Sequence, residues 1–235
     1  MYRWRDYNLP IDDDTAEKFA TYMEKYPEFY QNLAKIVRQN TPHQIDRPAV
    51  VDLGVGPGLL SLEIQRVMPE VSIMGLDPSI KMLKLARKRA FKADFKRFGV
   101  ILSVAENIPL KSDSVDVLMS RFSLLYWKHP KDGFSEIFRV LKPGGKLILE
   151  ALNADFPIWK LFLIKLHMRS NSAGQEVIRY HSNAYKSAYT MIQVEQLLTD
   201  SRFRLLAKEG NKKDWKFVII AEKNRKIGKM MDFKI

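Results

Sequence analysis

The sequence predicts an α/β protein: a doubly wound, mostly parallel sheet of seven strands, with a helical cap before it and an inserted helical lid. Two observations lead to this prediction. From residue 49 onward, short and nearly continuous apolar runs alternate with helical stretches, which is typical of a parallel sheet covered on both faces. Near the end, a short polar turn joins the last two apolar runs, which predicts a hairpin with one antiparallel strand.

Composition excludes several classes of protein. The chain has 235 residues, enough for one sizeable domain with a small cap. Apolar residues make up 46% and charged residues 28%, which is typical of a globular rather than a disordered chain. The absence of cysteine excludes disulfides, thiolate metal ligands and cysteine nucleophiles. We also expect no metal site.

Residues 1–48 are expected to form the helical cap. Helices are predicted over 16–26 and 29–38, where apolar residues recur at helical spacing. Pro27 separates the two helices, and Thr41-Pro42 ends the second. The start has no apolar core or cleavage site of a secretion signal, and no apolar run has the roughly 20 residues that a membrane span needs, so we expect a cytoplasmic protein.

The sheet-forming domain is predicted over residues 49–222. Its parallel strands are expected at 48–53, 71–76, 100–104, 114–119 and 146–149. Helices are predicted after the first two strands, with Pro78 at a favourable first helical position, and another over 133–140. A turn at Pro143-Gly144-Gly145 is expected before the fifth strand.

The last third departs from this alternation. An amphipathic helix is predicted over 191–201, followed by hairpin strands at 203–208 and 216–221. The stretch of about 155–190 is too long for a plain connection, so we expect it to form the lid. Residues 223–235 are expected to be a basic tail.

Positive charge gathers in one segment. The chain carries a net charge of +12, and residues 81–97 contain eight basic residues and one acid, Asp94. Such a segment attracts phosphates, nucleic acid or acidic partners. A solvated helix face is the favoured interpretation, because no aromatic RNA-binding motif accompanies the charge.

Two acids flank a glycine cluster at a strand end, where open parallel sheets bind ligands. The glycines of 54–58 let backbone amides approach a ligand. Asp77 closes the next strand, where an acid can accept hydrogen bonds from two ribose hydroxyls. Asp52 is an unusual charge inside a strand unless it faces a cationic ligand group or caps loop amides. The dinucleotide-binding fingerprint lacks its third glycine, because Leu59 stands there.

Five motifs in order over about residues 49–150 resemble those of class I S-adenosylmethionine-dependent methyltransferases, in particular the small-molecule subgroup (methyltransferase type 11) that includes quinone-biosynthesis enzymes. The resemblance implies a Rossmann-like fold, S-adenosylmethionine as cofactor, and a methyl-transfer activity. The matching segments are Val-Val-Asp-Leu-Gly-Val-Gly-Pro-Gly at 50–58, Gly-Leu-Asp-Pro-Ser at 75–79, Ala-Glu-Asn-Ile-Pro-Leu at 105–110, Ser-Asp-Ser-Val-Asp-Val-Leu-Met-Ser at 112–120, and Arg-Val-Leu-Lys-Pro-Gly-Gly-Lys-Leu at 139–147.

The same resemblance assigns roles to single residues. The amides of 54–58 suit the carboxylate of the cofactor, Asp52 its ammonium group, and Asp77 its ribose diol. Ile80 or Met82 is expected on one adenine face. The expected cofactor-binding residues are Asp52, Gly54, Val55, Gly56, Gly58, Asp77, Pro78, Met82, Ala105, Glu106, Ser120 and Arg121.

Methyl transfer is an in-line displacement in which alignment supplies most of the acceleration, so a general base is optional. The candidates for a catalytic side chain are His129, Arg121 and His181. Phe122, Leu124 and Leu125 are expected in the core rather than in contact with a ligand.

A small-molecule acceptor is the leading hypothesis. The Asn/Asp-Pro-Pro-Tyr motif, which resembles the signature of enzymes that methylate planar amino groups, is absent, because Ser120-Arg121-Phe122-Ser123 stands in its place. Three alternatives stay open: an RNA methyltransferase or a protein methyltransferase that uses the basic segment 81–97, and a cofactor-binding regulatory protein without turnover. The apolar lid residues are also compatible with a homodimer or a lipid-like acceptor.

Overall fold

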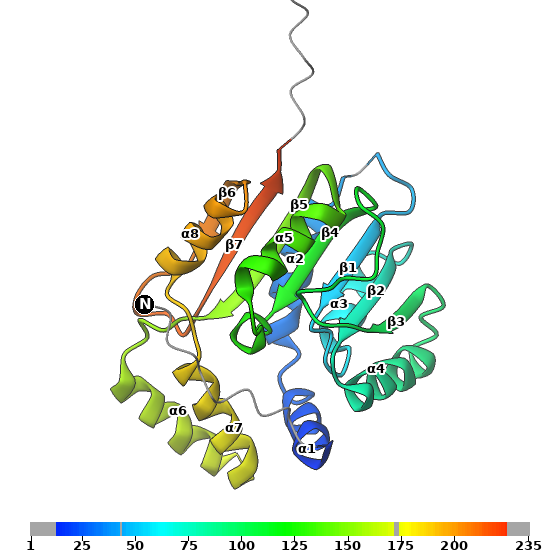
Figure 1. The fold of residues 1–235 in the computed structure, drawn as a ribbon. Coiled ribbons are helices and arrows are strands. Elements are labelled where there is room, and N and C mark those ends of the chain that lie inside the picture. Colours follow the sequence, from blue (N-terminus) through cyan, green and yellow to red (C-terminus); the bar gives the residue numbers. More distant parts are fainter. Residues whose placement is uncertain (1–12, 43, 172–173, 225–235) are drawn as a thin grey trace, which may run out of the picture.

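The computed structural model describes residues 13–42, 44–171 and 174–224. Within these residues, seven strands form one sheet in the order β3-β2-β1-β4-β5-β7-β6 (Figure 1). The strands are β1 (Ala49–Leu53), β2 (Ser72–Asp77), β3 (Phe98–Leu102), β4 (Val115–Arg121), β5 (Leu141–Leu152), β6 (Phe203–Glu209) and β7 (Lys216–Lys223). The helices are α1 (Asp13–Met23), α2 (Glu28–Asn40), α3 (Leu59–Val67), α4 (Ile80–Lys92), α5 (Pro130–Val140), α6 (Ile158–Ser170), α7 (Gln175–Lys186) and α8 (Met191–Asp200), with a 3₁₀ turn η1 (Leu124–Tyr126).

The strand pairing confirms the predicted fold. β1 pairs in parallel with β2 on one side and β4 on the other, and β3 and β5 extend the sheet in parallel outward from them. The order therefore reverses between β1 and β4, which is where such sheets bind ligands. β7 runs antiparallel to both β5 and β6, as the predicted hairpin requires.

Helices cover both faces of the sheet. Successive residues of a strand face opposite sides, and β4 divides accordingly between two core clusters. Leu118 belongs to the cluster that includes residues of α5 and α8, whereas Val117 and Met119 belong to the cluster that includes residues of α2 and α3. This burial on both faces explains why the strand sequences are apolar throughout rather than alternating.

Three local predictions were wrong. The third strand lies at Phe98–Leu102 rather than 100–104, because the Ser103 hydroxyl bonds the Val104 and Asn107 carbonyls and turns the chain away. The turn at 143–145 is a bulge inside β5, since the register with β4 shifts there. Pro78 does not begin α4: Ser79 is the cap, and its Oγ accepts the Met82 amide at 3.3 Å.

The cap and the lid approach each other beyond the carboxyl ends of the central strands. In Figure 1, α6 and α7 project away from the sheet beside α1. Lys18 of α1 forms a 2.7 Å ion pair with Glu176 of α7, and Tyr22 packs against the lid cluster that contains Met168 and Val177. The segment predicted as a lid therefore contains two helices in contact with the first helix of the chain. The division into cap, domain and tail remains a prediction, and residues 1–12 and 225–235 lie outside the described residues.

The basic segment 81–97 lies mostly on α4. Among the described residues, ion pairs join Arg89 to Glu24, Lys96 to Asp94, and Arg97 to Glu70. No helix in the described part of the chain has the length and apolar character needed to cross a membrane.

Candidate active site

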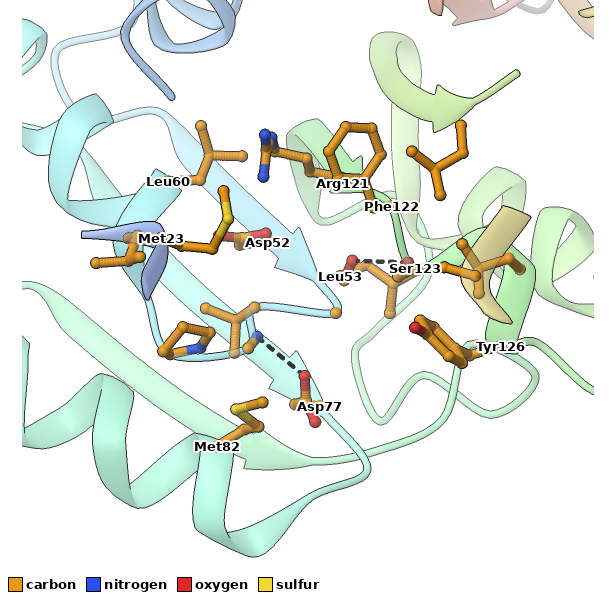
Figure 2. A pocket seen from close by; sticks show the side chains of 18 of the residues that line it. Met23, Asp52, Leu53, Leu60, Asp77, Met82, Arg121, Phe122, Ser123 and Tyr126 are labelled. Carbon is orange, nitrogen blue, oxygen red and sulfur yellow. Dashed lines mark hydrogen bonds between the residues drawn. The ribbon is translucent and has the colours of Figure 1, made fainter. Parts of the chain in front are cut away.

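A cavity of about 790 Å³ opens at the carboxyl ends of β1, β2 and β4. Its size lies within the range of small-molecule sites. The sheet supplies one wall, α1 and α2 of the cap a second, and α6 and α7 of the lid a third. Figure 2 shows Asp52 and Asp77 on one side of the cavity and Phe122 and Tyr126 on the other. The cavity therefore joins a polar end to an aromatic end.

The glycine loop after β1 is held in a shape that only glycine permits. Gly54 has φ of +78°, and a Cβ built on it would lie 2.3 Å from Cβ of Ser123. Gly58 has φ of +82° and packs against Ala86 of α4, where a Cβ would come within 3.1 Å. Gly58 does not line the cavity, so its role is to fit the loop against α4.

The amides of this loop are already paired within the protein, and their binding to the cofactor carboxylate stays a prediction. Gly54 and Val55 both donate to the Leu76 carbonyl, at 2.7 and 3.0 Å. The Gly56 amide donates to Asp77, and the Gly58 amide donates to the Val55 carbonyl at 3.0 Å. The backbone amides that were expected to bind a ligand hold the loop against β2.

Asp77 ends β2 and lines the cavity. Its Oδ2 accepts the Gly56 amide at 2.9 Å and its Oδ1 accepts the Ser79 amide at 2.8 Å. Burial raises the pKa of this carboxyl, and the two backbone bonds oppose the rise. A carboxylate has about four acceptor positions, so two amides leave capacity for two hydroxyls. The geometry fits the ribose diol predicted for it.

Asp52 is a buried acid at the end of β1. It is 2% exposed, and its Oδ2 accepts the hydroxyl of Ser61 at 2.7 Å. Burial raises its pKa to about 7; the Ser61 bond and Arg121 oppose this rise, and Asp77 adds to it. An acid in this state gains from a cationic ligand group, because the cation stabilises the ionised form. Asp52 therefore fits the ammonium group predicted for it.

Arg121 is a buried donor at the end of β4, not part of a surface ion pair. Its Nε donates to Glu150 Oε2 at 2.7 Å, and its guanidinium carbon lies 4.4 Å from the Tyr30 ring centroid and 4.2 Å from that of Phe122. The side chain is 9% exposed, and its Nη2 has no hydrogen-bond partner among the described residues. Buried donors rarely stay unpaired, so this atom fits a ligand oxygen. Figure 2 shows the guanidinium on the same side of the cavity as Asp52.

The residues predicted around adenine also come together. Pro78, Met82, Ala105 and Glu106 all line the cavity near Asp77. Of the two candidates for the adenine face, Met82 lines the cavity, whereas Ile80 is 57% exposed outside it. Pro78 precedes Ser79, the cap residue of α4, and Met82 lies in the first turn of that helix. Ala105 and Glu106 come after β3.

Besides Gly58, two predicted site residues lie away from the cavity. Ser120 is fully buried and bonds Ser123 over 2.5 Å between their Oγ atoms, and Ser123 lines the cavity in its place. His129 is the cap residue of α5, outside the lining, and its amide donates to Glu106 at 2.8 Å. Ser120 does not line the cavity because its side chain is buried within β4. The loop that follows Arg121 turns toward the site and brings Ser123 to the cavity wall.

Several lining residues were missed. Phe122 and Leu125 were expected in the core, yet both line the cavity, and Phe122 adopts a φ of +54° at the start of the turn. Aromatic residues of the cap and one from the β6–β7 turn also line it: Tyr22, Tyr26, Phe29, Tyr30 and Trp215. Helical spacing in the cap predicted burial of such side chains and gave no signal of the surface that they contact.

Two lid histidines face the cavity. Burial and the nearby Lys165 lower the pKa of His181 to about 4, so its imidazole is neutral at neutral pH. Its ring lies 5.3 Å from that of Tyr185. His167 also lines the cavity, and its Nε2 lies 2.8 Å from Nδ2 of Asn171. Of the three catalytic candidates, Arg121 and His181 thus line the cavity.

The strand order, with a cavity at the reversal between β1 and β4, is the class I, Rossmann-like fold found in solved S-adenosylmethionine-dependent methyltransferases. Residues 51–149 match the family model described as a methyltransferase domain. Residues 51–149 are therefore similar to a methyltransferase domain, within a fold shared with class I methyltransferases, and S-adenosylmethionine is the cofactor of that class.

Curated relatives extend beyond the matched region. The chain is 34% identical over 133 residues to the biotin biosynthesis bifunctional protein BioHC of Saccharophagus degradans. This alignment covers 57% of the chain and 23% of that relative. It is 32% identical over 114 residues to the ubiquinone/menaquinone biosynthesis C-methyltransferase UbiE of Geotalea daltonii. That alignment covers 47% of the chain and 48% of the relative. The chain thus matches about half or less of the length of these relatives.

Solved structures share the whole fold. A SAM-dependent methyltransferase from Aquifex aeolicus superposes with a TM-score of 0.65 at 19% identity, covering 91% of this chain and 99% of that one. A SAM-dependent methyltransferase from Methanosarcina mazei gives 0.60 at 23% identity, covering 81% and 97%.

Proposed function

We propose that this protein transfers a methyl group from S-adenosylmethionine to a small-molecule acceptor. The observation that carries the proposal is the single cavity in which two buried acids and an unpaired arginine donor adjoin an aromatic compartment. When bound, the cofactor supplies a methyl group on a positively charged sulfur. The protein's contribution is to hold two reactants in line, which alone accounts for a large rate acceleration.

The polar end of the cavity is assigned to the cofactor. Asp77 accepts the ribose hydroxyls, and Met82 with Ala105 and Glu106 surrounds the adenine. Asp52 binds the ammonium group and Nη2 of Arg121 binds the carboxylate, so that one acid and one base on neighbouring strands match an amino-acid zwitterion. This arrangement replaces the loop amides as carboxylate donors.

The aromatic end is assigned to the acceptor. Phe122 and Tyr126 follow β4, Phe29 comes from the cap, and Trp215 from the β6–β7 turn. The rings of Phe29 and Trp215 are 5.7 Å apart, and those of Phe122 and Trp215 are 5.5 Å apart. Such walls exclude water and suit an apolar or planar acceptor. His181 is the neutral side chain available to accept a proton from it.

The names of relatives support a small-molecule acceptor. Beside the quinone C-methyltransferase, they include a malonyl-[acyl-carrier protein] O-methyltransferase of Marinomonas sp. and a 2-methyl-6-phytyl-1,4-hydroquinone methyltransferase of Arabidopsis thaliana. The alternatives of an RNA or protein substrate, of a regulatory protein without turnover and of a homodimer have no further support and stay predictions. The cytoplasmic location also stays a prediction.

A transfer screen tests the proposal. The protein is incubated with methyl-labelled S-adenosylmethionine and with separated small metabolites, RNA and protein from the source cell. We expect label in the small-metabolite fraction and its loss in an Asp77→Ala variant. Label in RNA or protein alone would contradict the proposed acceptor class, and cofactor binding without any transfer would favour the regulatory alternative.

A further inference from the structure

The outward side of the lid helix α6 carries an unusual number of exposed apolar side chains. Its inner side is engaged, because Ile164, His167 and Met168 line the active-site cavity. On its other sides, five large apolar side chains are between 45% and 83% exposed: Ile158, Trp159, Phe162, Leu163 and Leu166. Surface helices normally turn their apolar stripe to the core, so exposure on this scale marks an interaction surface.

A basic groove lies beside this apolar surface. The groove between α6 and α7 has a volume of about 800 Å³, and no carboxylate lines it. Four cations do: Lys165 and Arg169 from α6, and Arg179 and Lys186 from α7. Arg169 and Arg179 are exposed and form no ion pair with any described residue. α6 itself contains no acidic residue.

Helical spacing aligns the two features. Ile158, Phe162, Lys165 and Arg169 follow one another at intervals of four, three and four residues and all line the groove. Trp159, Leu163 and Leu166 form the adjacent stripe, which is exposed. The surface therefore presents apolar side chains next to cations, the pattern of helices that lie in a membrane interface.

We propose that this surface, made of the outward sides of α6 and the α6–α7 groove, docks on an anionic lipid bilayer. The apolar stripes enter the boundary between headgroups and acyl chains, and the groove cations bind lipid phosphates. The 13 residues of α6 are too few to cross the bilayer, so the attachment is peripheral. A second copy of the chain fits less well, because a symmetric contact would bring the same cations face to face.

Vesicle sedimentation with the full chain tests the proposal. Vesicles of phosphatidylcholine alone are compared with vesicles that contain phosphatidylglycerol, at low and high salt. Two double variants probe the surface: Trp159→Ser with Phe162→Ser removes apolar area, and Arg169→Gln with Arg179→Gln removes charge. Phe91→Ser is the matched control, since Phe91 is an aromatic residue that is 88% exposed on the basic helix α4.

We expect binding to the anionic vesicles that weakens with salt, and a loss of about tenfold or more in each double variant but not in the control. Cofactor affinity, measured separately by calorimetry, should be unchanged in all three variants, which shows that they fold and separates this proposal from the proposed activity. Three results would overturn it: no vesicle binding by the wild type, an equal loss in Phe91→Ser, or a wild-type dimer that the apolar double variant converts to a monomer.

Discussion

The Nε atom of Arg121 donates a hydrogen bond to Oε2 of Glu150 at 2.7 Å, and this bond fixes the guanidinium at the cavity wall. Glu150 is 1% exposed and also accepts a bond from Nζ of Lys216. The rings of Tyr30 and Phe122 pack against the same guanidinium. Because these contacts hold the side chain in place, its unpaired Nη2 is a preorganised donor for an anionic oxygen.

The first prediction concerns this donor. In an Arg121→Gln variant, the affinity for S-adenosylmethionine should fall by about 10- to 100-fold, the usual worth of a hydrogen bond to a charged group. The affinity for 5′-methylthioadenosine, which lacks the amino-acid end, should be unchanged. Calorimetry with both ligands measures the difference. An equal loss for the two ligands would mean that Arg121 supports the site without binding the carboxylate.

Asp52 should make cofactor binding depend on pH. Its pKa of about 7 means that it holds a proton below neutrality, and the cofactor's ammonium group favours the ionised form. Binding near pH 7 should therefore release protons, and affinity should fall as the pH drops below 7. Calorimetry in buffers of different ionisation heat measures the release. An affinity that is flat between pH 6 and 8 would rule out the assigned contact.

The free energy of unfolding of an Asp52→Asn variant gives an independent test of the raised pKa of Asp52. The folded state raises this pKa from 3.8, so it holds the proton more tightly than the unfolded state does. The resulting stabilisation is present at low pH and is lost as the pH rises toward 7. Without ligand, the variant should gain on the order of 1–4 kcal/mol relative to the wild type between pH 5 and pH 8. Thermal unfolding at the two pH values measures this difference.

A third prediction separates steric clash from backbone strain in the glycine loop. Gly54→Ala adds a Cβ at 2.3 Å from a side-chain carbon in a left-handed conformation, and should cost about 3 kcal/mol or more and abolish cofactor binding. Gly56→Ala meets nothing within 4 Å but has φ of +51°, and should cost only about 1 kcal/mol. Gly174→Ala, at an open position of ordinary φ, is the control. Denaturant unfolding ranks the three, and similar costs for Gly54 and Gly174 would contradict the structure.

The fourth prediction concerns proton transfer to His181. Because its pKa is lowered to about 4, this imidazole is neutral across the range from pH 5.5 to 8. With an acceptor identified by the transfer screen, His181→Phe should lower kcat by about 100-fold and leave cofactor affinity unchanged. The wild-type kcat should not titrate with His181 in that range. An unchanged kcat in the variant would show that the acceptor needs no base from the lid.

The sheet and the polar end of the site could be predicted because they depend on local signals. The apolar runs that end at Gly54 and Asp77 indicate two parallel strands whose carboxyl ends lie together. Asp52 is therefore placed beside them independently of the loop conformations. Met82 and Ala105 were expected from the resemblance to class I methyltransferases. These residues line one cavity, as expected.

The aromatic end could not be predicted, because tertiary contacts create it. Tyr26 follows α1 and Phe29 lies on α2, and only the closure of cap and lid over β4 gives their rings a cavity to line. Ser120 was expected in the loop, but β4 continues to Arg121, so Ser120 is buried in the strand and Ser123 lines the cavity instead. The pairing of the loop amides could not be predicted either, because the acceptors of Gly54, Val55 and Gly56 lie on β2.

Calorimetric titration of S-adenosylmethionine into the wild type and Asp77→Ala tests the central claim most directly. We predict one site with a dissociation constant on the order of 1–100 μM, or about −5.5 to −8 kcal/mol, and no measurable binding in the variant. Asp116→Asn is the matched control, because Asp116 is also a buried acid that accepts a backbone amide, from Ala49 at 2.9 Å, but lies outside the cavity. Equal affinity in the wild type and Asp77→Ala would contradict the account.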